Sequence, residues 1–170
     1  MAQRGASPGL RPYLPSDTAA LSALFRASIE ALSAEDYDPD QREAWASAAD
    51  DAAAFAARLA GALTIVALVG GEIAGFASLK DNKLLDMLYV RPDFAGQGVG
   101  GALAEAIEKL AGARGTKTLT VEASDTARDF FAARGYVAQS RNTVTIAGEW
   151  LGNTTMTREL AAPPAAAGSH

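Results

Sequence analysis

The stretch Val90-Arg-Pro-Asp-Phe-Ala-Gly-Gln-Gly-Val-Gly-Gly-Ala-Leu103 links an apolar run, residues 84–90, to a segment of helical periodicity, residues 99–110. The run predicts a strand and the segment an amphipathic helix, so the glycines stand at a strand-to-helix turn. Glycine lets the main chain approach a ligand closely, and the start of a helix offers unpaired N–H groups to an anion. The stretch therefore predicts a cradle for a pyrophosphate, with a plain glycine-rich turn before a core helix as the alternative.

The overall composition predicts one globular domain and excludes several kinds of site. The 170 residues suffice for a sizeable core, and 49% of them are apolar. A net charge of −5 disfavours a nucleic-acid or membrane surface. The chain has no cysteine and its single histidine is the last residue, so we expect no thiolate catalysis, histidine triad or metal site. We find no membrane-spanning run and no signal-peptide pattern, and we therefore expect a cytoplasmic protein.

The pattern around the glycine stretch alternates between helices and strands. Upstream, three helices begin at cap signals, at Ser16-Asp17, Asp38-Pro39 and Asp50-Asp51. A short edge strand precedes these helices and a hairpin with a Gly-Gly turn follows them, over residues 10–14, 63–69 and 72–79. Downstream come a strand, a helix and a closing antiparallel pair, over residues 116–123, 124–134, 136–146 and 151–160.

The helix of the glycine stretch lies between two predicted strands, residues 84–90 and 117–123. A strand–helix–strand unit of this kind almost always forms a right-handed parallel crossover. The predicted fold class is therefore α/β, with a mixed, mostly antiparallel central sheet that contains one parallel pair and is flanked by helices. Residues 1–160 form a single domain in this prediction, and residues 161–170, rich in alanine and proline, form a disordered tail.

A dinucleotide-binding fold is one alternative for the glycine stretch. Gly96-Gln-Gly-Val-Gly-Gly101 fits the pattern G-x-G-x-x-G, and Glu122 follows about 20 residues later, as that fold requires. In such a site, however, the first glycine follows the strand almost at once, whereas residues 91–95 intervene here. The upstream hairpin is antiparallel, and too few strand–helix units remain downstream. The context therefore disfavours a nucleotide-dependent oxidoreductase.

The chain from Leu10 to Leu160 resembles the GNAT superfamily of N-acetyltransferases. The signature loop of that superfamily, [Q/R]-x-x-G-x-[G/A], follows a strand and a Val-x-Pro step, and Gly98-Val-Gly100 and Val90-Arg-Pro92 match these features. Arg134-Gly135-Tyr136 is similar to a later Gly-aromatic position, and the predicted element order agrees. Residues 36–45 further resemble a bacterial branch of uncharacterised acetyltransferases.

The resemblance implies the acyl-CoA N-acyltransferase fold, in which the two parallel strands splay apart to admit acetyl-CoA as co-substrate. The acetyl group would pass by direct attack to a primary amine of a small molecule or peptide, and by analogy we expect a homodimer. The residues implied in coenzyme binding belong to the strand end, the glycine loop and the following strand and helix: Leu88, Tyr89, Val90, Gly96, Gln97, Gly98, Val99, Gly100, Gly101, Ser124 and Phe131.

Three positions depart from the superfamily pattern. Ala95 stands where the loop usually begins with Arg or Gln, and Ser124 takes the place of a frequent asparagine. Phe131 occupies the position at which many members carry the tyrosine that protonates the departing thiolate. Because Phe131 removes the usual general acid, a non-catalytic acyl-CoA-binding module is the alternative function.

Acetyl transfer needs a neutral amine, a polarised carbonyl and a proton source. We expect the main-chain N–H of Leu88 or a neighbour to polarise the carbonyl. Asp86 and Glu122 are the candidate bases, although each is also typical of a solvent-facing or ion-paired carboxylate. Tyr136 and Tyr89 are the remaining phenols near the motif; Tyr136 completes the predicted catalytic set, and packing in the core is the alternative for both.

The early helices are expected to cover the acceptor side of the site. They carry three residues that we predict to form the substrate wall: Tyr37, Gln41 and Trp45. Trp45 lies at helical spacing from Gln41, so a core position is its alternative.

Overall fold

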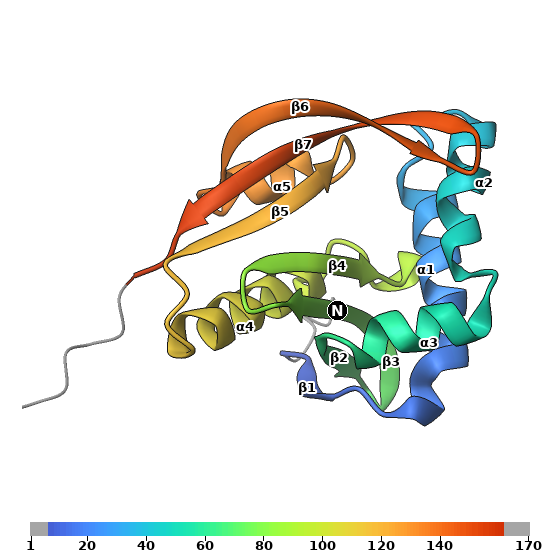
Figure 1. Ribbon diagram of the computed structural model, residues 1–170. Helices are drawn as coiled ribbons and strands as arrows, with labels where there is room; N and C mark the ends of the chain where they lie inside the picture. The colour runs from blue at the N-terminus through green and yellow to red at the C-terminus, as the bar shows by residue number, and fades with distance from the viewer. Residues whose placement is uncertain (1–6, 162–170) are drawn as a thin grey trace, which may run out of the picture.

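The computed structural model describes residues 7–161 and contains one mixed β-sheet flanked by helices (Figure 1). Its strands are β1 Gly9–Pro12, β2 Leu63–Val69, β3 Glu72–Lys80, β4 Leu84–Val90, β5 Thr118–Ser124, β6 Val137–Ile146 and β7 Glu149–Glu159. Its α-helices are α1 Thr18–Leu32, α2 Pro39–Ala46, α3 Ala52–Ala60, α4 Val99–Ala113 and α5 Arg128–Ala133. The strand order is β1-β2-β3-β4-β5-β7-β6, in which only the β4–β5 pairing is parallel. The predicted fold class is confirmed.

The parallel pair β4 and β5 is joined at one end only. Leu84 pairs with Thr120 and Leu85 with Val121, and beyond these residues the two strands diverge (Figure 1). The register of β4 against β3 also shifts, because Leu85 pairs with Leu79 whereas Met87 pairs with the preceding Ser78. Asp86 is therefore the extra residue of a β-bulge at the point where the strands part.

Helices cover both faces of the sheet and create two cores. On one face, α4 buries Leu103 and Ile107, and α5 buries Phe131. On the other face, α1 and α3 bury Phe25 and Phe55, whose ring centroids lie 5.4 Å apart. The bulge in β4 distributes its residues between the two cores, since it reverses the alternation of side chains along the strand.

Local capping signals define several element ends. The carboxylate of Asp38 accepts the N–H of Gln41, and the amide of Gln41 accepts the N–H of Asp38, which forms a capping box at the start of α2. Asp51 caps α3 by accepting the N–H of Ala54. Asp17 makes no such bond to α1; its carboxylate instead pairs with Arg11 at 2.7 Å.

The structure differs from several of the predicted boundaries. Strand β1 ends at Pro12 rather than at residue 14, and β5 begins at Thr118 rather than at residue 116. Helix α5 begins at Arg128 rather than near residue 124, because the hydroxyl of Ser124 accepts the N–H of Ala127 at 3.1 Å and closes a turn. Helix α4 continues to Ala113, and β7 begins at Glu149. The predicted tail lies outside the described residues from position 162 onward.

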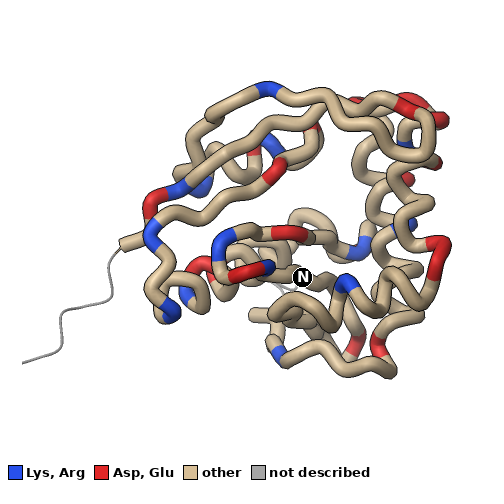
Figure 2. Tube along the Cα trace, in the orientation of Figure 1, with Lys and Arg blue, Asp and Glu red and all other residues tan. Residues whose placement is uncertain are grey.

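The charged residues within residues 7–161 are spread along the chain (Figure 2). Figure 2 shows Lys and Arg interspersed with Asp and Glu along the trace rather than gathered in one run. No helix within this range is long and apolar enough to cross a membrane.

Candidate active site

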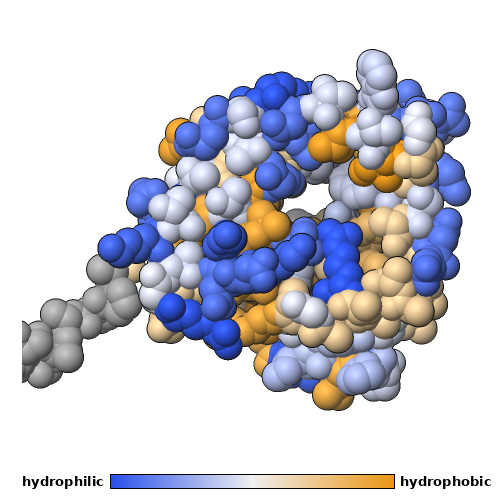
Figure 3. Space-filling view, viewed as in Figure 1, coloured by the Kyte–Doolittle hydropathy of each residue, from blue (hydrophilic) through white to orange (hydrophobic). Residues whose placement is uncertain are grey.

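A cleft of about 640 Å³ occupies the space where β4 and β5 diverge. Its walls come from five regions: the end of β4, the glycine loop, the end of β5 with the start of α5, the last turns of α1, and Trp45 of α2. Figure 3 shows the same molecule hollowed between the β6–β7 hairpin and β4. The site thus exists because β4 and β5 splay apart; a fully paired parallel sheet would leave no such cleft between them.

The glycine loop forms one end of this cleft. Gly96 and Gly98 have φ angles of +77° and +85°, which only glycine adopts without strain. A Cβ atom added to either residue would meet no described atom within 4 Å, so the space in front of both residues is free. Gly98 is the N-cap of α4 and offers no capping side chain, which leaves the first N–H groups of that helix for an external anion.

The other loop residues have different roles. Val99, Gly100 and Gly101 line the cleft in the first turn of α4. A Cβ on Gly100 would lie 3.5 Å from the ring of Phe130, so this glycine also lets α4 and α5 pack closely. The side chain of Gln97 donates to the main-chain oxygen of Asp93 at 3.1 Å and does not line the cleft.

The edge of β4 that faces the cleft carries unpaired main-chain groups. The N–H of Arg91 donates to the carbonyl of Ala74 at 2.8 Å, so residue 91 faces β3. Because hydrogen-bonded residues alternate along an antiparallel pair, Tyr89 also directs its main-chain groups to β3. Leu88 and Val90 therefore direct theirs toward β5, which has already diverged. Leu88, Tyr89 and Val90 all line the cleft.

The two predicted carboxylates both lie at the junction of the strands. Asp86 lines the cleft but receives a two-pronged ion pair from Arg58 of α3, at 3.0 Å and 3.3 Å. Glu122 also lines the cleft, and its Oε1 accepts a 2.5 Å hydrogen bond from the hydroxyl of Thr155. Both oxygens of Asp86 are engaged by a cation, whereas Glu122 is held by a neutral hydroxyl.

The two phenols are separated by the fold. Tyr89 lines the cleft, and burial raises the pKa of its phenol to about 12, although the hydrogen bond from Trp45 opposes this shift. Tyr136 is 3% exposed and donates to Glu108 of α4 at 2.9 Å, and neither of these two residues lines the cleft. Burial and the charge of Glu108 raise the pKa of Tyr136. This position corrects the predicted catalytic role of Tyr136.

Phe131 and Ser124 lie on the β5–α5 side of the cleft. Phe131 is buried and packs edge-on against Phe130 and Tyr136, with ring centroids 5.0 Å and 5.1 Å apart. It lines the cleft but offers no proton. The hydroxyl of Ser124 is already an acceptor for Ala127, so this residue shapes the turn beside the cleft.

Two of the three residues of the predicted substrate wall lie beside the cleft, and their role in substrate binding stays a prediction. Trp45 and Tyr37 line a second cavity, of about 280 Å³, that adjoins the cleft. Tyr37 donates to the carbonyl of Gly152 at 2.6 Å and accepts the N–H of Asp125 at 2.8 Å, and burial raises its pKa. Gln41 lines neither cavity; its side chain donates to the carbonyl of Trp150 and caps α2, which corrects its predicted role.

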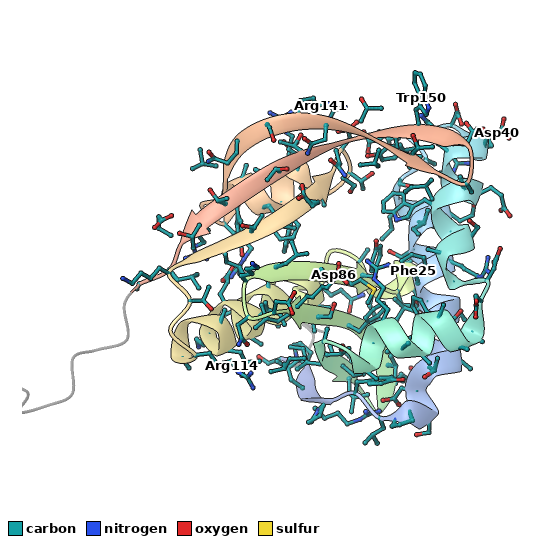
Figure 4. All side chains as sticks on the ribbon, in the orientation of Figure 1. Phe25, Asp40, Asp86, Arg114, Arg141 and Trp150 are labelled. Atoms are coloured by element: carbon teal, nitrogen blue, oxygen red, sulfur yellow. The ribbon has the colours of Figure 1, made fainter. Side chains whose placement is uncertain are left out.

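Sequence reasoning missed Arg58 and the hairpin residues Val144, Ile146 and Leu151, all of which line the second cavity. Figure 4 shows Asp86 on β4 and shows Trp150 directed away from the gap at the end of the hairpin. Arg58 of α3 donates to Asp86 at 3.0 Å. No local signal identifies these residues, because α3 and the β6–β7 hairpin approach β4 only through tertiary packing.

Comparison with known proteins assigns the family. Residues 33–160 match the family model described as acetyltransferase (GNAT) domain. The chain is 31% identical over 147 residues to the uncharacterized N-acetyltransferase YafP of Escherichia coli K12, covering 86% of this chain and 93% of YafP.

Solved structures agree with this assignment. A GCN5-related N-acetyltransferase from Rhodopseudomonas palustris, also named "Aminotransferase, Class-II", is 61% identical with a TM-score of 0.91, covering 94% of this chain and 99% of that one. PaiA N-acetyltransferase from Thermoplasma acidophilum, solved with coenzyme A, shares the fold at 19% identity with a TM-score of 0.75, covering 91% and 99% of the two chains. The family model, the splayed strand pair and the glycine loop thus lead to one conclusion: the chain belongs to the GNAT superfamily of acetyl-CoA-dependent N-acetyltransferases.

Proposed function

We propose that the cleft between β4 and β5 binds acetyl-CoA and transfers its acetyl group to a primary amine. The observation that carries this proposal is the combination of a free β4 edge with an anion-binding helix start at one end of the same cleft. A pantetheine arm carries amide groups that suit a strand edge, and a pyrophosphate suits the N–H groups of α4. The residues present therefore fit the coenzyme.

The coenzyme residues in this proposal are those predicted, with one distinction. Leu88 and Val90 bind through main-chain groups, and the loop binds through the amides of residues 96–101. Gln97 contributes only its main chain, since its side chain is bonded to the carbonyl of Asp93. Tyr89, Phe131 and Ser124 contribute cleft surface.

Acetyl-CoA supplies an activated thioester carbonyl, and the protein supplies polarisation and proton transfer. The N–H of Leu88, which points into the gap beside the bulge at Asp86, would stabilise negative charge on the carbonyl oxygen. Glu122 would take a proton from the amine, directly or through water, while the amine nitrogen forms its bond to the carbonyl carbon. The carbon–sulfur bond breaks, and Tyr89 would donate a proton to the sulfur.

Tyr89 rather than Tyr136 is the proton donor in this proposal. Its pKa of about 12 keeps the phenol protonated near neutral pH, and it lines the cleft whereas Tyr136 does not. Asp86 would have a positioning role rather than act as the base, because both of its carboxylate oxygens accept hydrogen bonds from Arg58.

The alternative function is a module that binds acyl-CoA without catalysis. The argument for it is that Phe131, which cannot donate a proton, stands at the position where many members of the superfamily carry a tyrosine. The presence of Glu122 and Tyr89 on the cleft wall favours the enzyme. Titration of acetyl-CoA by calorimetry, followed by a thiol-release assay over a panel of amines, separates the two. We expect binding and amine-dependent thiol release; binding without release on any amine supports the module, and preferential binding of a nicotinamide cofactor supports an oxidoreductase.

A homodimer is a further prediction of this proposal. Strand β6 ends the sheet and leaves a main-chain edge on which a second copy would pair. Light scattering coupled to gel filtration measures the mass in solution, and a mass of one chain at all concentrations contradicts the prediction.

A further inference from the structure

The second cavity adjoins the cleft on the side of the β6–β7 hairpin. The two cavities share a set of lining residues where β4 and β5 part: Trp45, Leu85, Asp86, Tyr89, Glu122 and Ser124. Beyond these, the cleft continues to the glycine loop, whereas the second cavity continues to Val144, Ile146 and Leu151 of the hairpin. An acceptor held in the second cavity would therefore meet the reaction site from the side opposite the pyrophosphate cradle.

Aromatic rings form one wall of the second cavity. Tyr37 and Trp45 stand edge to face with centroids 5.4 Å apart, and Trp45 and Tyr89 do so at 6.3 Å. The polar ends of two of these rings are committed elsewhere: Tyr37 to Gly152 and Asp125, and the indole N–H of Trp45 to Tyr89 at 3.2 Å. Tyr37 and Trp45 therefore offer mainly apolar ring surface to a ligand.

The charges on the cavity wall are one arginine and two carboxylates. The Nε and Nη2 groups of Arg58 donate hydrogen bonds to Asp86, so the charges of these two residues compensate each other. The other carboxylate, Glu122, has no cationic partner among the described residues that line this cavity. The wall thus combines one available negative charge with aromatic and aliphatic surface.

We propose that the acceptor is a small primary monoamine with a flat apolar body and no carboxylate, of the arylalkylamine kind; this inference rests on the proposed acetyl transfer. The amine would lie at Glu122 and the ring between Trp45 and the aliphatic residues of the hairpin, where a planar body matches the wall. A cavity of about 280 Å³ lies at the small end of the range of ligand pockets, which suits a small amine rather than a peptide chain.

Two other amine classes fit this wall less well. The carboxylate of an amino acid would face Glu122 and Asp86, while Arg58 is already paired. The second ammonium group of a diamine would face Val144, Ile146 and Leu151, whose apolar side chains cannot pair with it.

Binding is tested with the single-tryptophan variant Trp150→Phe, which retains Trp45 as the only tryptophan of the chain. Its fluorescence is followed with coenzyme A bound, during titration with phenethylamine, phenylalanine and putrescine. We expect phenethylamine to change the emission with an affinity at least tenfold above that of the other two. The matched variant Trp45→Phe retains only Trp150, which is 71% exposed and directed away from the gap, and should not respond (Figure 4).

Turnover of the wild-type enzyme with the same three amines completes the test. A kcat/KM for phenethylamine at least tenfold above those for phenylalanine and putrescine supports the proposal. An equal or higher value for phenylalanine or putrescine overturns the acceptor class while leaving acetyl transfer intact. If acetyl-CoA does not bind, the proposed function itself fails; if it binds and none of the three amines is acetylated, the acceptor class is overturned.

Discussion

The indole N–H of Trp45 on α2 donates a hydrogen bond of 3.2 Å to the phenol oxygen of Tyr89 on β4. Because an indole nitrogen only donates, this bond occupies an acceptor site of the phenol and does not use its proton. The phenol of Tyr89 can therefore still donate its proton to another acceptor in the cleft. Burial, which raises the pKa of Tyr89 to about 12, keeps that proton in place at neutral pH.

Replacement of Tyr89 by Phe removes this proton donor and should lower kcat about 100-fold, within the range typical of general acid catalysis. The dissociation constant of acetyl-CoA should stay unchanged, since Tyr89 is proposed to contribute only ring surface to the coenzyme. Trp45→Phe, which keeps the phenol of Tyr89 but removes its hydrogen-bond donor and part of the ring packed on it, should lower kcat less. Steady-state kinetics checks the order of the two variants, and an unchanged kcat for Tyr89→Phe would mean that solvent protonates the sulfur.

The raised pKa of Tyr89 also predicts the pH dependence of kcat. An acid catalyst is lost when pH rises through its pKa, and an unperturbed tyrosine would be lost near pH 10. With a pKa of about 12, Tyr89 remains protonated beyond that point. We expect no falling limb of kcat up to about pH 10; a fall beginning near neutral pH would assign the proton donor to a different group.

Replacement of Glu122 by Gln keeps the shape of the side chain and removes its basicity. We expect kcat/KM to fall about 100-fold at neutral pH if Glu122 takes the proton of the amine. Glu159→Gln is a matched control, because Glu159 accepts a 2.8 Å hydrogen bond from Thr118 in the same way that Glu122 accepts one from Thr155. Glu159 does not line the cleft, so equal losses in both variants would contradict the assignment.

Replacement of Gly98 by Leu should raise the dissociation constant of acetyl-CoA at least tenfold, because the side chain would enter the space in front of the α4 N-terminus. Gly148→Leu is the control: Gly148 also has a positive φ, +83°, with no described atom within 4 Å of an added Cβ, but lies in the turn of the β6–β7 hairpin. Both variants bear a similar backbone cost of about 1–2 kcal/mol. Calorimetric titration separates them, and unchanged coenzyme affinity in Gly98→Leu would exclude the cradle.

Replacement of Glu108 by Gln should reduce the free energy of unfolding by about 2 kcal/mol at neutral pH. Glu108 is 8% exposed, pairs with Arg134 at 2.5 Å and Arg158 at 2.9 Å, and accepts from Tyr136. Burial alone would raise its pKa, but the bonds from Arg134 and Tyr136 and the charges of both arginines lower it. A lowered folded-state pKa stabilises the protein above the unfolded-state value of about 4.3, and the effect is lost as pH falls through the folded-state value.

Chemical denaturation at several pH values measures this difference. The gap between wild type and Glu108→Gln should be largest at neutral pH and shrink below about pH 4. Glu105→Gln on the same helix is the control, since Glu105 forms only an exposed pair with Lys109 and should change stability by less than about 0.5 kcal/mol. A gap that persists unchanged at low pH would show that the charge of Glu108 does not contribute.

The local signals of the sequence were sufficient for most of the fold. The capping residues Asp38 and Asp51 predicted the starts of two helices, and the Gly70-Gly71 turn predicted the hairpin. Each of these signals acts over a few residues through hydrogen bonds or a positive φ, so it does not depend on distant parts of the chain. The position of the glycine loop at a strand-to-helix turn is of the same kind.

What the sequence by itself determined is therefore the order of the elements, the family and the place of the glycine loop between β4 and α4. The tertiary structure alone decided which side chains meet in the cleft. One bulge at Asp86 sends Leu85 to one core and Met87 and Tyr89 to the other, because an extra residue reverses the alternation of a strand. Packing between elements likewise brought Arg58 to Asp86 and hid Tyr136 behind α4, since contacts between distant segments depend on register and burial rather than on local pattern.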